Sequence, residues 1–480
     1  MQSTNKTMKP LLFSSAAICA FFSVLVSPSR AQSGSLDITF NPGSGVNGYV
    51  SCMALETNGQ IVIGGNFASF NGANRSDVAR LNSDGSVDTG FDPGVGPNGP
   101  LYSVAVQSDG KMLIGGAFSS INGVNWNQPA RLRVDGSVDT SFDTSAADGA
   151  GANGAVKALA LQVDGKVLIG GYFSTVSGTS CIGIARLNTN GTLDASFNTG
   201  TGISNGVVSA LGLQSTGEVI VGGSFTGING VARNYLARLN SDGSVDATFN
   251  AELQDGSVAS LTITPQDQIV IGGTFTSING YSRNGIARLN ADGSLDTTFN
   301  PGLGVNGLPG SSGVLGVSVQ FDGKVVIGGS FENVNNTVRY SVARLNTNGT
   351  LDVSFNPGTG TLYNAQVYTI NCLASQPDGK TLIGGNFSYF NGTNINGIAR
   401  LNGDKLPGTN PQLLAANLYF GMNLSGTVSN TYRIEWTANL ATASLWTPLL
   451  DVTLQSNSMF IVAPSPPAGQ RFYRAVQLSP

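Results

Sequence analysis

The residues whose type and spacing could support chemistry are arginines and aspartates that recur at fixed intervals. Where the two follow each other in one repeat, as Arg80 and Asp88 do, the aspartate comes eight residues after the arginine. Carboxylates can act as general acids, bases or nucleophiles, whereas an Arg–Asp pair on neighbouring strands forms a structural ion pair. Because the pattern recurs in every repeat, we expect the structural role. The arginines are Arg80, Arg131, Arg186, Arg238, Arg288, Arg344 and Arg400, and the aspartates are Asp37, Asp88, Asp139, Asp194, Asp246, Asp296 and Asp352.

The composition excludes several other chemistries. The 480 residues contain no histidine, so a Ser-His-Asp or Cys-His centre and a His-ligated metal site are ruled out. The formal net charge is −4, which argues against nucleic acid as the main partner. No Asp-x-Asp-x-Asp-Gly calcium loop occurs. We therefore predict no catalytic residue, no metal site and no cofactor.

A loop position that is equivalent in all seven repeats carries candidate binding residues. It holds Arg75, Trp126, Cys181, Arg233, Arg283, Arg339 and Ile395. The arginines could present cations to an acidic polymer or a carboxylated sugar, or they could hydrogen-bond carbonyl groups of their own loops. Trp126 and Tyr363 are the aromatic residues best suited to stack on a sugar or a peptide. The predicted binding residues are Arg75, Trp126, Arg233, Arg283, Arg339 and Tyr363.

The elements that must position these residues are repeated strands. An apolar run that ends in Gly-Gly occurs seven times, with first glycines at positions 64, 115, 170, 222, 272, 328 and 384. Each repeat contains four strand-like runs, and two-residue Asp-Gly or Asn-Gly turns separate several of them, which is a strong hairpin signal. Four strands in about 50 residues is typical of one propeller blade. The sequence therefore predicts an all-β, seven-bladed β-propeller.

The ends of the repeat array predict a closed ring. Residues 35–41 match the fourth strand but have no blade before them, and the last repeat stops at residues 398–404 without a fourth strand. We expect this N-terminal strand to act as a latch that completes the seventh blade and pairs Asp37 with Arg400. Cys52 and Cys372 would then lie in adjacent blades. A bridge between them is conceivable, but small buried thiols are the preferred interpretation.

Differences in repeat length are confined to one segment. The Gly-Gly is followed by the fourth-strand phenylalanine after 27 residues in all six complete cases, whereas that phenylalanine precedes the next hairpin by 18 to 24 residues. These connections lead from one blade to the next and should open on the same face as the loops between second and third strands. Length variation on one face often marks a binding surface, and drift in tolerant loops is the alternative.

Two further segments flank the repeats. Residues 1–31 combine Lys6 and Lys9 with an apolar stretch at 11–26 and a small-residue cleavage site, which is typical of a secretory signal peptide. A membrane anchor is the alternative, but the stretch is shorter than the roughly 20 residues of a spanning helix. We expect the propeller over 32–402, a linker over 403–411, and a small C-terminal antiparallel β-domain over 412–480.

The repeated motifs LDTTFNPGLGVNG, DGKVVIGGSF and NGIARLNADGSLDTTFN resemble the delta-60 repeat family of bacterial exported proteins. The resemblance covers residues 35–402, and it implies a β-propeller without an established activity or transferable catalytic residues. The segments YRIEW, LWTPL and RFYRA are similar to a short terminal β-module of exported surface proteins.

These patterns favour an exported, non-enzymatic binding, adhesion or scaffold protein that uses the variable loop face. Its partner would be a surface or extracellular glycan or protein, and its location extracellular, at the cell surface or periplasmic. Cleavage of the signal would leave no stable transmembrane segment. The alternative is a carbohydrate-active hydrolase or lyase with carboxylate-only chemistry at the channel mouth, for which Asp148 and Asp255 are the irregular carboxylates.

Overall fold

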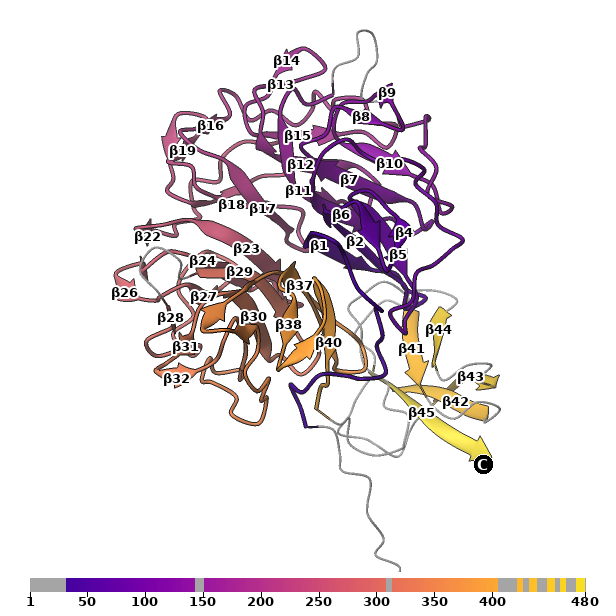
Figure 1. Cartoon of the computed structure of the whole chain (residues 1–480). Coiled ribbons are helices and arrows are strands. Elements are labelled where there is room, and N and C mark those ends of the chain that lie inside the picture. Colours follow the sequence, from indigo (N-terminus) through magenta and orange to yellow (C-terminus); the bar gives the residue numbers. More distant parts are fainter. Residues whose placement is uncertain are drawn as a thin grey trace, which may run out of the picture. The chain divides into compact units, whose positions relative to one another are not determined.

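Seven blades of antiparallel strands form the main part of the protein (Figure 1). The computed structural model describes residues 32–142, 151–307 and 313–404 together with five strands of the C-terminal segment. Within this described part there is no helix. The inner strands are β1 (Tyr49–Leu55), β6 (Leu101–Val106), β11 (Ala155–Leu161), β17 (Val208–Leu213), β23 (Val258–Ile263), β29 (Gly313–Val319) and β36 (Thr369–Ser375). The second strands are β2 (Ile61–Asn66), β7 (Met112–Gly116), β12 (Val167–Tyr172), β18 (Val219–Gly223), β24 (Ile269–Gly273), β30 (Val325–Ser330) and β37 (Thr381–Asn386). The third strands are β5 (Val78–Leu81), β10 (Ala130–Leu132), β15 (Ile184–Leu187), β21 (Leu236–Leu239), β27 (Ile286–Leu289), β33 (Val342–Leu345) and β40 (Ile398–Leu401).

The blades close into a ring, as the sequence predicts for a seven-bladed propeller. Each inner strand contacts the inner strands of its neighbours, and β36 of the last blade contacts β1 of the first. In Figure 1 the indigo first blade accordingly lies beside the orange last blade. The core sits between blades: at the closure, Val50 and Ile63 of blade 1 pack with Leu382 and Ile398 of blade 7. Burying apolar side chains between sheets in this way is the main source of stability.

The N-terminal segment lies against the last blade. Leu36 pairs with Leu401 in an antiparallel bridge, and the amide of Asp37 donates to the carbonyl of Arg400 at 2.8 Å. Phe40 is buried in the cluster that joins the first and last blades. Residues from the two ends of the repeat array therefore complete one blade.

The fourth strand is shorter than the sequence predicts. In each blade it amounts to one bridging pair, such as Leu81 with Val87. The chain then turns, because Asp88 accepts a hydrogen bond from the amide of Gly90 with its side chain and one from the amide of Phe91 with its carbonyl. An aspartate that captures its own backbone in this way ends a strand.

The turns between first and second strands also differ from the expected two-residue form. Glu56 accepts from the amide of Gly59 and donates its own amide to Gln60, and Gly59 has a φ of 87°. This is a three-residue loop in which the last position is left-handed. Asp267 takes that position in blade 5 with a φ of 59°.

A second set of short strands forms what we term the loop face. Hairpins join the second and third strands: β3 (Ser69–Phe70) with β4 (Ala73–Asn74), β8 (Ser120–Ile121) with β9 (Val124–Asn125), β13 (Thr175–Val176) with β14 (Thr179–Ser180), β19 (Gly227–Ile228) with β20 (Val231–Ala232), β25 (Ser277–Ile278) with β26 (Tyr281–Ser282), β31 (Asn333–Val334) with β32 (Thr337–Val338), and β38 (Tyr389–Phe390) with β39 (Thr393–Asn394). Connections between blades add β16 (Ile203–Ser204), β22 (Leu253–Gln254) and β28 (Val305–Asn306), which pair with β19, β25 and β31. The variable connections and these hairpins therefore share one face, as expected.

The C-terminal segment contains separate antiparallel strands. They are β41 (Gly421–Ser425), β42 (Thr431–Thr437), β43 (Thr447–Thr453), β44 (Ser458–Val462) and β45 (Phe472–Ser479). β41 pairs with β44, and β42 lies between β43 and β45. The expected signal segment, 1–31, and most of the expected linker, 405–411, lie outside the described residues.

Candidate functional site

The repeated arginines and aspartates form the expected ion pair in every blade. The Nε of Arg400 lies 2.7 Å from the carboxylate of Asp37, although the two residues are 363 positions apart. Burial would raise the pKa of Asp37, but hydrogen bonds from Thr39, Lys380 and Arg400 outweigh burial and lower the pKa to about 2. The other pairs are Arg80–Asp88, Arg131–Asp139, Arg186–Asp194, Arg238–Asp246, Arg288–Asp296 and Arg344–Asp352.

The same guanidinium groups also connect neighbouring blades. Arg400 stacks over the ring of Phe40 at 4.9 Å and donates to the carbonyl of Ser83 in blade 1 at 2.6 Å. In blade 6, Arg344 reaches the carboxylate of Asp404 at 2.6 Å. These charged groups therefore already have their partners within the blades, through ion pairs and through stacking on an aromatic ring. They leave no free carboxylate for catalysis at these positions.

The predicted loop arginines lie against their own hairpins. Arg75 donates from Nη1 to the carbonyl of Asn74 at 2.7 Å, and Arg233, Arg283 and Arg339 make the same bond to the residue before each. Burial lowers the pKa of Arg283 and of Arg339. The four arginines therefore stand one per blade, tied to local carbonyls, and do not converge into one cationic cluster.

The remaining predicted loop residues take two different positions. Trp126 occupies the same hairpin position as the arginines and packs on the core between blades 1 and 2. Tyr363 lies on an extra hairpin that the blade 6 to blade 7 connection forms from β34 (Leu362–Tyr363) and β35 (Gln366–Val367). Its ring stacks on Tyr389 of β38 with centroids 3.7 Å apart and planes 7° apart. The sequence identified Tyr363 but not its partner.

The inner strands carry a feature that sequence reasoning missed, namely a β-bulge at the same place in every blade. In blade 1 the register with β2 shifts between Val50 and Cys52. Gly65 faces the bulge, and a Cβ atom there would lie 2.1 Å from the carbonyl oxygen of Tyr49. The second glycine of each Gly-Gly pair has this same relation to its own inner strand, at Gly116, Gly171, Gly223, Gly273, Gly329 and Gly385. The repeated Gly-Gly is thus the signal for the bulge.

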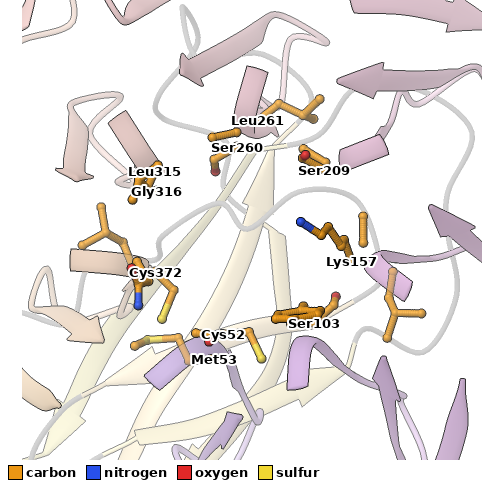
Figure 2. Close-up of a pocket in the computed structure, with 18 of the residues that line it drawn as sticks. Cys52, Met53, Ser103, Lys157, Ser209, Ser260, Leu261, Leu315, Gly316 and Cys372 are labelled. Atoms are coloured by element: carbon orange, nitrogen blue, oxygen red, sulfur yellow. The ribbon is translucent and has the colours of Figure 1, made fainter. Parts of the chain in front are cut away.

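The bulge residues border a cavity of about 320 Å³ along the central channel (Figure 2). Three consecutive residues from each inner strand line it, and the bulge residue is the first of the three. Unlike the ion pairs, this position changes from blade to blade. The seven bulge residues are Ser51, Tyr102, Lys157, Ser209, Ala259, Leu315 and Asn371.

Lys157 is the one charged side chain in the cavity lining. It is exposed and in Figure 2 extends into the space between the inner strands. Its Nζ lies 5.6 Å from the centroid of the Tyr102 ring, a cation–π distance. Asn371 donates to the carbonyl of Val50 at 2.9 Å, across the ring closure.

The cavity lining contains no Asp or Glu. The alternative hypothesis, carboxylate-only chemistry at the channel mouth, therefore finds no carboxylate among the described lining residues of this cavity. Asp148 falls outside the described residues, and Asp255 lies in a loop turn with a φ of 51°. Across the part of the chain that is described, no cluster of three or more His, Cys, Asp or Glu side chains could hold a metal ion.

The described cysteines are free thiols. Burial raises the pKa of Cys52 to about 12, and it also raises the pKa of Cys372. Neither forms a disulfide; Cys52 is buried, as the preferred interpretation expects, whereas Cys372 is only partly buried. Within the residues that the structure describes, no helix is long and apolar enough to cross a membrane.

Comparison with known proteins identifies the repeats. A family model described as "Domain of unknown function (DUF5122) beta-propeller" matches seven segments that together make up about half of the chain. They are residues 56–91, 107–142, 162–197, 214–249, 266–299, 320–355 and 376–404. A search of curated proteins found no match.

Several solved structures are similar to this chain at low identity. The extracellular domain of a putative one-component system from B. thetaiotaomicron is 11% identical with a TM-score of 0.43; the match covers 94% of this chain and 59% of that one. The WD40 β-propeller domain of Doa1 is 14% identical with a TM-score of 0.44, covering 78% and 97%. Virginiamycin B lyase from Staphylococcus aureus is 12% identical with a TM-score of 0.42, covering 74% and 94%.

Proposed function

This chain belongs to the DUF5122 β-propeller family, and we propose that it is an exported, non-enzymatic binding protein that uses its loop face. The proposal that the protein is exported is based on the signal-like sequence of residues 1–31. A binding role is supported by the ion pairs, because their carboxylates are engaged with arginines inside the blades. It is also supported by the absence of histidine from the sequence.

The observation that carries the proposal is the stacked pair of Tyr363 and Tyr389. Both rings are partly exposed, and the hairpin that presents Tyr363 follows from the extra length of the connection into blade 7. A pair that is already stacked loses little side-chain freedom when it binds a ligand. Rigid aromatic residues are typical anchors of binding surfaces for this reason. The ligand class that fits such a platform is a glycan or an aromatic-rich peptide.

The test is a glycan and peptide binding array with the full chain, run beside a broad hydrolase screen. For any ligand found, Tyr363→Ala should weaken binding by about tenfold or more. Tyr281→Ala is the matched control, since Tyr281 is a loop-face tyrosine that is 53% exposed and should leave affinity unchanged. Thermal unfolding checks that both variants fold. Turnover of any polysaccharide, or equal binding by Tyr363→Ala, would contradict the proposal.

A further inference from the structure

We infer that the central channel is a second binding site, in which Lys157 receives the carboxylate of a small sugar acid. This goes beyond the proposed function, because it uses the inner strands and not the stacked tyrosines of the loop face. The inference rests on an unpaired charge, on the bulges that present it, and on the composition of the cavity.

Lys157 differs from every other lysine of the described chain. Lys111, Lys166, Lys324 and Lys380 each lie within 4 Å of at least one carboxylate. Within the same described residues Lys157 has neither an ion pair nor a hydrogen bond, and its Nζ meets only the ring of Tyr102. An ammonium group has three donors, so this one retains its full capacity for an anion.

The cavity around Lys157 favours a single negative charge. Its described lining holds no second charged residue of either sign, so nothing there offsets the positive potential. A cleft with one sign of charge concentrates ligands of the opposite sign. One compact ammonium, with no arginine fork beside it, suits a carboxylate better than a phosphate.

The neutral lining points to a ligand that also carries hydroxyl groups. Serine hydroxyls border the cavity at Ser51, Ser103 and Ser209, and the amide of Asn371 adds to them. The ring of Tyr102 offers an apolar face beside the ammonium. A volume of about 320 Å³ lies at the small end of ligand pockets, which matches a single sugar acid.

The bulge explains how the scaffold permits such a site. Each inner strand places one extra residue against its Gly-Gly partner. A bulge leaves that residue unpaired and redirects its side chain, while strand pairing continues on both sides with a shifted register. A lysine at position 157 therefore enters the channel, while the preceding Val156 stays buried in the core between blades. The bulge residue differs from blade to blade, and only serine occurs twice, as Ser51 and Ser209.

The experiment is calorimetric titration of the full chain with D-glucuronate, with D-glucose as the uncharged match. Wild-type protein should bind D-glucuronate saturably and D-glucose at least about tenfold more weakly. Lys157→Met should lose about tenfold or more in affinity, whereas Lys157→Arg should keep most of it. Lys111→Met, which removes a lysine outside the channel, should bind like wild type.

Several outcomes would overturn the inference. They are the absence of saturable binding of D-glucuronate, unchanged binding by Lys157→Met, or equal loss in Lys111→Met. A parallel titration with diglycine, which has a carboxylate but no sugar ring, tests the ligand class. Diglycine binding as tight as D-glucuronate binding would refute the sugar-acid assignment. Thermal unfolding of each variant separates loss of binding from loss of the fold. Tyr363→Ala should leave D-glucuronate binding intact, so this site and the loop face can fail independently.

Discussion

The outer edge and the inner strand of each blade come from the same repeat, yet they differ in what varies. At the outer edge, arginine, aspartate and phenylalanine recur in all seven blades with nearly the same geometry. At the inner bulge, the residue ranges from alanine to lysine. The outer set stabilises the blade and joins it to the next one. The inner set has no such common task, so its variation is where specificity for a ligand can reside.

The largest expected effect tests whether the outer pairs are scaffold. Arg400→Ala or Asp37→Ala should each destabilise the protein by about 3–5 kcal/mol, because each leaves an uncompensated buried charge. The double variant should cost clearly less than the sum, with a coupling of about 0.5–3 kcal/mol. Urea unfolding of the four proteins measures this coupling. Arg133→Ala is the control, since the Arg133 side chain is 46% exposed and 3.6 Å from Asp139; it should cost only about 0.2–1 kcal/mol. Simple additivity at Arg400 and Asp37 would count against the pairing.

An intermediate loss of stability is expected when the pH is lowered. Hydrogen bonds outweigh burial and lower the pKa of Asp37, Asp139 and Asp352 to about 2, from an ordinary value of 3.8. Because the folded-state pKa values are depressed, these groups contribute stability above about pH 4, and that contribution is lost as the pH falls toward 2. Urea midpoints measured between pH 6 and pH 2 should drop mainly in this window. Asp37→Asn should flatten the drop, and an unchanged pH profile in that variant would remove Asp37 from the explanation.

The smallest effect is expected in the channel. Ser209→Ala should change the free energy of unfolding by less than about 0.5 kcal/mol, because Ser209 borders the cavity and its side chain has no hydrogen bond within the described residues. Urea unfolding measures this directly. A loss as large as that at the outer pairs would mean that the inner ring is also structural, and the contrast between the two regions would disappear.

The features that could be predicted from the sequence are those that recur at a fixed spacing in the repeats. The spacing of eight between Arg80 and Asp88 predicts a pair, and the unmatched ends of the array predict that Asp37 meets Arg400; both pairs are present. The shortened fourth strand was not predicted, because the hydrogen bonds that an aspartate accepts from its own turn do not alter the apolar alternation.

The candidate sites were harder to predict for physical reasons. A bulge shifts the two-residue alternation of faces at one point, so an unbroken alternation assumed through Lys157 does not place its side chain in the channel. The partner of Tyr363 is 26 residues away on another loop, and only the folded chain brings the two rings together. For the loop arginines the sequence left two roles open, as cations for a ligand or as donors to loop carbonyls, because loop geometry decides which way a guanidinium faces; at Arg75 it bonds its own hairpin.

Completion of the last blade by residues from the start of the chain has a consequence for assembly. The strand that contains Leu36 and Asp37 closely resembles the equivalent strands of the other repeats, and its partner surface on β40 would be the same on every copy of the protein. Before the ring closes, the free strand of one molecule can therefore complete the last blade of another. Strand exchange of this kind links rings into oligomers through contacts that already exist in the monomer. Folding at low protein concentration favours closure within one chain, whereas crowding of unclosed chains favours the exchanged form.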